Sequence, residues 1–179
     1  MGKVVNVVES ERKYKLDHFH KDSVWDREFI IYQWYDSVEK EKKTKLIIDL
    51  QSQTIKWVRV TKNRLSNSDS QKLVEYLSGS DISLDDMIGQ QFVCKRRSLK
   101  GKISIDYFVR SNEICHYLIE DEGDYNTFAS LFKEDNLLIE DVTDDTRYRN
   151  TNMTTMFSEE DRDNLFFLLS ILLYPSEIK

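Results

Sequence analysis

Cysteine, proline, glycine and alanine are all scarce in this 179-residue sequence, which has two cysteines, one proline and five glycines. Cys94 and Cys115 have no near cysteine neighbour, which excludes a Cys-x-x-Cys redox or zinc motif. No two glycines have the spacing of a phosphate-binding loop, so the Walker A and Rossmann fingerprints are excluded as well. This scarcity counts against α/β enzymes that bind nucleotides through glycine-rich loops.

Long hydrophobic runs are also missing. No apolar stretch reaches the roughly 20 residues that a transmembrane helix needs, and the first ten residues lack the apolar core of a signal peptide. The chain is 40% hydrophobic and 32% charged, with a net charge of −6, which is typical of a wetted globular domain. We therefore expect a cytoplasmic protein with no membrane partner.

Several stretches are rich in β-branched and aromatic residues at strand length. Residues 27–35, 45–50 and 54–60 are predicted to form an antiparallel meander, and residues 90–97 and 102–110 a hairpin. Between the two, Asn67 or Ser68 is suited to cap a helix, and Gly79 is suited to end it. Strands interrupted by one helix before a last hairpin are typical of the OB-fold.

The C-terminal region differs from the rest. Residues 120–150 are acidic, and Ser158 with the carboxylates after it predicts the start of a helix. That helix is apolar all round, so it is either buried against the sheet or docked on a partner, for example in a homodimer. The predicted fold is α+β, mainly antiparallel β: an OB-like small barrel with an inserted helix and a C-terminal apolar helix. We expect a β-rich domain over residues 1–119, with an acidic segment and C-terminal helix over 120–179 packed on it or docking from it.

Charge is divided unevenly along the chain. Residues 94–110 contain six bases and one acid, whereas residues 111–146 contain eleven acids and one base. Strand alternation places basic and aromatic residues together on one predicted face, which is the surface that single-stranded DNA or RNA needs for stacking and phosphate pairing. The predicted nucleic-acid-binding residues are Trp57, Arg59, Lys95, Arg97, Lys100, Lys102, Phe108 and Arg110.

A set of residues within 27–110 also carries a family resemblance: Leu84, Met87, Ile88, Gly89, Phe92, Lys100, Gly101 and Lys102. Their pattern, a Leu-x-x-Met-Ile-Gly turn followed by a Lys-Gly-Lys hairpin, resembles phage-type OB-fold proteins associated with single-stranded DNA. Gln90 stands where that pattern has lysine. The resemblance implies a non-enzymatic accessory protein of a phage or mobile element that binds single-stranded nucleic acid.

Two alternatives remain open. The acidic residues could imitate phosphates and block a basic nucleic-acid-binding protein, such as a host-defence nuclease. Alternatively, the carboxylates of 120–124 and 140–145 could form a metal-dependent nuclease site. The partner-binding residues of the inhibitor hypothesis are Glu120, Asp121, Glu122, Asp124, Asp144 and Asp145.

Histidine offers a weaker metal hypothesis. His18 and His20 lie two residues apart, and His116 could complete a site, but exposed polar histidines are the favoured interpretation. No catalytic triad, nucleophile elbow or His-Glu-x-x-His motif is present. We therefore expect no catalytic residues, no bound metal and no cofactor.

Overall fold

The computed structural model describes residues 4–16, 25–37, 41–79, 82–110, 117–124 and 139–173, without the side chains of residues 37, 110 and 173. All of its strands belong to one antiparallel, eleven-stranded sheet. The strands are β1 (Val4–Ser10), β2 (Arg12–Leu16), β3 (Arg27–Ser37), β4 (Lys42–Asp49), β5 (Thr54–Arg64), β6 (Asp69–Leu77), β7 (Gln91–Lys100), β8 (Ile103–Arg110), β9 (Tyr117–Asp121), β10 (Ile139–Asp141) and β11 (Thr155–Met156).

The helical elements are few and mostly short. Three are 3₁₀ turns, η2 (Asp85–Met87), η3 (Thr146–Tyr148) and η4 (Asn150–Met153), and one is the α-helix α2 (Glu159–Leu173). The described residues contain no helix long and apolar enough to cross a membrane.

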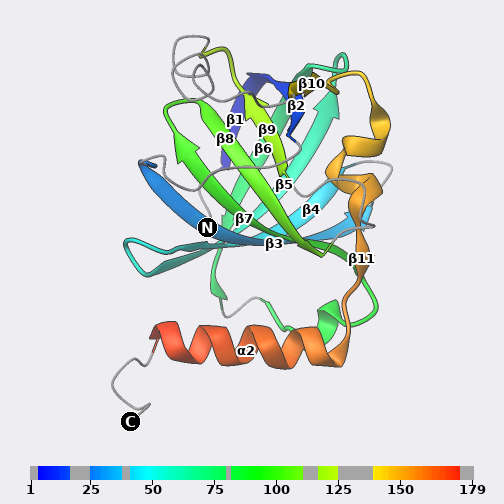
Figure 1. Ribbon diagram of the computed structural model, residues 1–179. Coiled ribbons are helices and arrows are strands. Elements are labelled where there is room, and N and C mark those ends of the chain that lie inside the picture. The colour runs from blue at the N-terminus through cyan, green and yellow to red at the C-terminus, as the bar shows by residue number, and fades with distance from the viewer. Residues whose placement is uncertain are drawn as a thin grey trace.

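The sheet is strongly curved (Figure 1). Its strand order is β1-β6-β5-β4-β3-β7-β8-β9-β2-β10, and β11 pairs with β7. Only Glu11 separates β1 from β2 along the chain, yet these strands lie at opposite ends of that order. The sheet must therefore roll until its two ends approach each other, which gives it a convex outer face and an enclosed concave face.

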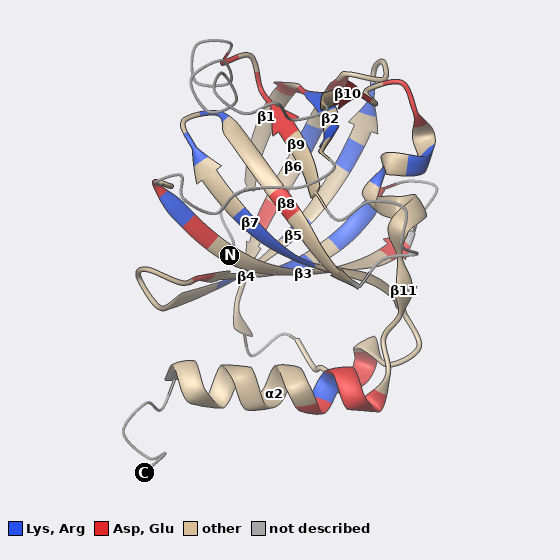
Figure 2. Cartoon of the chain, in the orientation of Figure 1, with Lys and Arg blue, Asp and Glu red and all other residues tan. Residues whose placement is uncertain are grey.

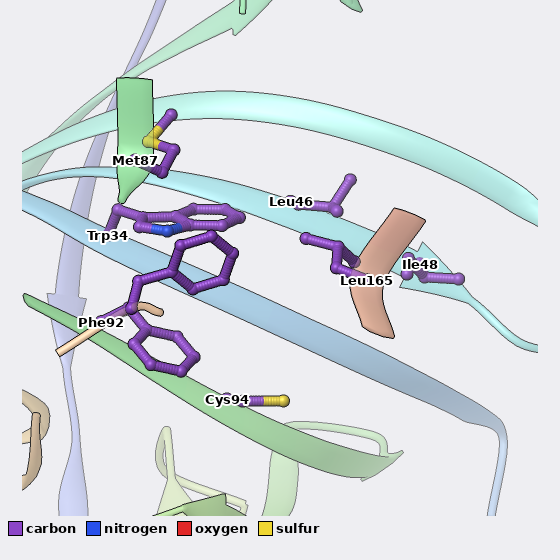
Figure 3. Packing of buried hydrophobic residues seen from close by; sticks show 8 residues of the cluster. Trp34, Leu46, Ile48, Met87, Phe92, Cys94 and Leu165 are labelled. Atoms are coloured by element: carbon purple, nitrogen blue, oxygen red, sulfur yellow. The ribbon is translucent and has the colours of Figure 1, made fainter. Parts of the chain in front are cut away.

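Helix α2 covers part of the convex face (Figure 1). Its N-terminus is capped by Ser158, whose hydroxyl accepts a hydrogen bond from the Asp161 N–H at 3.2 Å and donates one to the Asp161 carboxylate at 2.7 Å. Leu165 is fully buried in the core cluster beneath the helix (Figure 3). The other buried members are Trp34, Leu46, Ile48, Met87, Phe92, Cys94 and Phe157. The predicted C-terminal helix is thus confirmed, and its buried face belongs to the core.

Truncating the buried face of α2 should weaken the whole fold. We expect Leu165→Ala to lower the free energy of unfolding by about 2–4 kcal/mol, because it removes a fully buried side chain and leaves a cavity. Phe167→Ala is the matched control: Phe167 is 63% exposed on the same helix, and its truncation should change stability by less than about 0.5 kcal/mol. Urea denaturation of both variants measures this, and equal losses would contradict the packing described.

The sequence predicted the class of this fold better than its topology. The mainly antiparallel β class is confirmed, and β3, β4, β5, β7 and β8 lie where strands were expected. The inserted helix is wrong: residues 69–77 form β6, which pairs with β1 on one side and β5 on the other. Pairing on both sides outweighs the local helical preference of this segment. The OB-like barrel is not confirmed, since the sheet has many more strands than an OB-fold and follows an open order.

Candidate functional site

The concave face of the rolled sheet carries an unusual concentration of charge. Alternation explains it: in β4, Lys43 and Lys45 point to the concave side while Leu46 and Ile48 point to the core beneath α2. Bands of basic and acidic residues cross the curved strands in Figure 2. We call this set of side chains the charged interior. Its cations are Lys13, Lys43, Lys45, Lys62, Arg64, Lys72, Lys95 and Arg97.

Asp106 is the centre of one group of ion pairs. It is fully buried and accepts hydrogen bonds from Lys95 at 2.5 Å and from Nε and Nη2 of Arg97, each at 2.6 Å. Arg97 also donates to Glu120 at 2.5 Å, and Lys13 lies 3.3 Å from the same carboxyl group. Burial alone would raise the pKa of Glu120, but Arg97 and the neighbouring lysines hold it well below its usual range. The Glu120 carboxylate therefore stays ionised inside the protein.

Glu9 and Glu11 form a second group at the junction of β1 and β2. Lys62 lies 3.3 Å from Glu9 and 3.2 Å from Glu11, and Lys72 also pairs with Glu9. Burial opposes ionisation of Glu9, but Lys72 and Lys62 lower its pKa to about 2. Burial, a hydrogen bond with Glu9 and the Glu9 charge raise the pKa of Glu122 to about 7. Two carboxyl groups thus meet here and share a proton near neutral pH.

Among the described residues, basic side chains outnumber acidic ones in the charged interior. Eight cations face five carboxylates that pair with them, namely Glu9, Glu11, Glu41, Asp106 and Glu120. Within the part of the chain that the structure describes, neither Lys43 nor Lys45 forms an ion pair. Burial and repulsion from Lys62 lower the pKa of Lys43 to about 7, and burial with repulsion from Lys43 lowers that of Lys45. An anion bound next to Lys43 and Lys45 would therefore favour their protonated form and supply the negative charge that they lack.

The two ends of the concave space differ. One end is filled by an apolar cluster that includes Tyr35, Phe108 and residues of the 142–153 segment, and Asn150 with Thr151 of this segment lines the charged interior. At the other end, Lys45, Lys72 and Arg97 also line a larger cavity of about 490 Å³. Between the paired side chains themselves only about 40 Å³ is free. The larger free space therefore lies at the wider end.

The predicted nucleic-acid-binding residues do not form one surface in the part of the chain that the structure describes. Lys95 and Phe108 are each 2% exposed on the concave side, and Arg97 is held there by two carboxylates. Trp57 lies on the convex side, where its ring stacks 5.9 Å from that of Trp34, and Arg59 pairs with Glu75 at 3.3 Å on that side.

The remaining residues of that set do not complete a surface. Lys100 is half-buried and Lys102 exposed at the β7–β8 hairpin, and Arg110 ends β8 with its side chain outside the described residues. On the convex side of β8, Ile103 and Ile105 are buried in a second core cluster, whereas Tyr107 and Val109 farther along that face are exposed. The predicted function of binding single-stranded nucleic acid is therefore wrong.

The acidic residues of the inhibitor hypothesis are also scattered. Glu120 points into the charged interior, and Glu122 meets Glu9 at its edge. Asp121 accepts the N–H groups of Gly123 and Asp124 in a turn, each at 2.8 Å. Asp144 accepts from Asn67 at 2.7 Å, and Asp145 caps η3 and pairs with Arg147. The described acidic residues of this set therefore do not form a single surface, and the inhibitor function is wrong too.

The metal hypotheses have separate outcomes. His18, His20 and His116 lie outside the described residues. Among those that are described, no three His, Cys, Asp or Glu side chains gather as ligands, and the carboxylates of 120–124 and 140–145 do not converge. The nuclease site is therefore wrong.

Comparison with known proteins gives little more. No family model and no curated protein matches the chain. Two solved structures, described as the hypothetical protein NE1496 and the inorganic triphosphatase NE1496, are each 18% identical over 80% of this chain and 95% of their own. Their TM-scores are 0.48 and 0.49. Neither description names a phage, DNA-binding or host-defence protein, so those predicted roles find no support. A likeness this distant assigns this chain no activity.

Proposed function

We propose that the charged interior binds a short chain of phosphate groups and hydrolyses it with the help of a divalent cation. The observation that carries this proposal is the surplus of basic side chains in the charged interior, above all the buried Lys43 and the half-buried Lys45. Buried charges without partners are costly, and binding sites commonly contain them because the ligand supplies the missing partner. Lysine and arginine together are the residues that bind phosphate groups.

The shape of the site favours a small polyphosphate over a nucleic acid. The cations come from β2, β4, β5, β6 and β7, so they surround the space instead of lying along one groove. An apolar cluster fills one end, which leaves no passage for a continuing strand. A triphosphate is compact, carries several negative charges and would meet cations on all sides.

The carboxyl groups suit a divalent cation. Mg²⁺ is usually held by one or two carboxylates together with water and substrate phosphates. Glu9 and Glu122 are the candidates, because they already approach each other closely enough to share a proton. A bound cation would replace that proton and supply positive charge to the phosphate oxygens.

The remaining side chains fit the chemistry of phosphoryl transfer. In hydrolysis, water attacks the terminal phosphorus and gives up a proton, and the bond from that phosphorus to the bridging oxygen breaks. The shortened phosphate chain departs with the bridging oxygen as the leaving group, and the attacked phosphoryl group is released as orthophosphate. The protein has little covalent chemistry to do, and catalysis depends on position and on stabilising negative charge. Lys95 and Arg97 are fixed by Asp106, and such preorganised cations would stabilise the charge without rearrangement.

Phosphate release tests the proposed activity. Inorganic tripolyphosphate is incubated with the protein and Mg²⁺ or Mn²⁺, and orthophosphate is measured over time. We expect metal-dependent release that Glu122→Gln lowers at least about tenfold, since it removes a ligand charge. Glu140→Gln is the matched control, because Glu140 is exposed on the outside and should not affect the rate. Absence of release with either metal would contradict hydrolysis.

Metal binding should depend on pH through Glu122. Its pKa of about 7 means that a cation must displace a proton below that pH. We expect Mn²⁺ affinity to rise up to about tenfold per pH unit between pH 5 and 7, and to level off above. Titration calorimetry of Mn²⁺ into the wild type and into Glu122→Gln measures this. A flat profile in the wild type would show that this pair does not hold the cation.

A further inference from the structure

The concave face changes from charged to apolar toward its wider end. Six side chains make up this apolar region, which we call the apolar collar: Phe29, Ile31, Ile47, Val58, Val60 and Val74. The strand register places them next to one another, since Ile31 is opposite Ile47 and Val60 is opposite Val74. Between β4 and β5, Ile47 is opposite Lys56 and Val58 is opposite Lys45. The apolar collar therefore spans β3, β4, β5 and β6 with lysine side chains between its two halves.

The apolar collar faces a cavity and not the packed core. It lines the space of about 490 Å³ at the wider end, which is within the usual size of small-molecule sites. Three cations of the charged interior, Lys45, Lys72 and Arg97, line this same space. One molecule could thus contact the cations with one end and the apolar collar with the other.

The chemistry of the apolar collar limits what that second end can be. Five of its six side chains are aliphatic and offer no hydrogen bond to a sugar or a nucleobase edge. The carboxylate of Asp49, at the rim, is already engaged by Arg27 and by the N–H groups of Gln51 and Ser52. The cavity has further polar lining residues outside the apolar collar: Thr54, Lys56, Tyr76, Lys102, Ser104 and Glu122. A polar organic group placed against the apolar collar itself would lose hydrogen bonds to water, which is costly.

We infer that the natural ligand is a phosphate or polyphosphate ester of an apolar organic group. Its phosphates would lie among Lys45, Lys72 and Arg97, and its hydrocarbon part would lie against the apolar collar. This inference rests on the proposed function for the phosphate end of the ligand and adds the class of its other end.

Calorimetry with matched probes tests the inference. Geranyl diphosphate is compared with inorganic pyrophosphate, and ATP with inorganic tripolyphosphate, all with EDTA so that no hydrolysis occurs. Burying even a few methylene groups should make geranyl diphosphate bind roughly 10- to 100-fold tighter than pyrophosphate, whereas ATP should gain nothing over tripolyphosphate. Equal affinity of the first pair, or a larger gain for ATP, would overturn the inference.

Variants separate the two parts of the site. Val60→Thr and Val74→Thr keep the side-chain volume but add a hydroxyl, and each should weaken geranyl diphosphate at least about fivefold without changing pyrophosphate. If either variant unfolds, the other still tests the apolar collar. If pyrophosphate binds and geranyl diphosphate binds no more tightly, this inference fails and the proposed function stands. If no probe binds, the proposed function fails with it.

Discussion

Lys43→Met should make the ligand-free protein more stable. Lys43 is 6% exposed and lies 5.7 Å from the Tyr35 ring centroid, and methionine matches the length of its apolar stem. Replacing a buried charge that lacks a carboxylate partner with an apolar side chain should raise the free energy of unfolding by about 1–3 kcal/mol at pH 6. Natural proteins retain such costly groups where function needs them.

The pH dependence of this effect has a definite sign. The pKa of Lys43 is about 7 in the folded protein and near its ordinary 10.5 when unfolded. The unfolded state therefore binds more protons between pH 7 and 10, so the wild type gains stability from this group as pH rises through that window. Lys43→Met should lose that gain, and its advantage should be largest below pH 7 and shrink toward pH 10.

Chemical denaturation at pH 6, 8 and 10 measures both effects. Lys42→Met is the matched control, because Lys42 is the neighbouring residue on β4 and is largely exposed beside Asp36. The control should change stability by less than about 0.5 kcal/mol at every pH. A Lys43→Met protein that is less stable than the wild type at pH 6 would show that the buried ammonium has a partner that compensates it.

Asp106→Asn should have the opposite and larger effect on stability. Asp106 is fully buried and neutralises Lys95 and Arg97. Without its charge the buried Lys95 loses its carboxylate partner and Arg97 keeps only Glu120. Removing one partner of a buried pair typically costs about 3–5 kcal/mol. Asparagine keeps the shape of the side chain, so a loss of this size would arise from charge and not from packing.

Thermal or urea denaturation of Asp106→Asn measures this loss. Glu140→Gln provides the comparison, since its ion pair with Lys15 is at the surface and the substitution should cost less than about 0.5 kcal/mol. Similar stability of the two variants would mean that the Asp106 group of ion pairs is solvated and does not behave as a buried cluster.

The strands were predictable from the sequence because their signal is local. Residues 27–35 and 54–60 are rich in β-branched and aromatic residues, and both lie in strands of the structure. Residues 69–77 were mistaken for a helix because Leu73, Val74 and Leu77 have helical spacing. Their strand conformation depends on pairing with β1, which begins more than 60 residues earlier in the chain.

The site was harder to predict because its charges resemble a solvated surface. Alternating charged residues usually mark the face of a strand that meets water. Here the same alternation, in Lys43 and Lys45 and again in Glu9, Glu11 and Lys13, marks the inside of a rolled sheet. Which face is enclosed depends on the curvature of the whole sheet, and this is a long-range property. For Glu9, Glu11 and Lys13, the alternation of charged residues along the chain was the sequence signal that could have indicated a shared face.

Binding of tripolyphosphate by the charged interior is the central claim, and titration calorimetry without metal tests it most directly. We expect one tripolyphosphate site per chain, with an affinity that falls as salt is added. In Lys43→Met the affinity should fall roughly 10- to 100-fold, the amount expected for one hydrogen bond to a charged group. Lys42→Met should bind like the wild type. No heat of binding, or equal affinity in the Lys43→Met protein and the wild type, would contradict it.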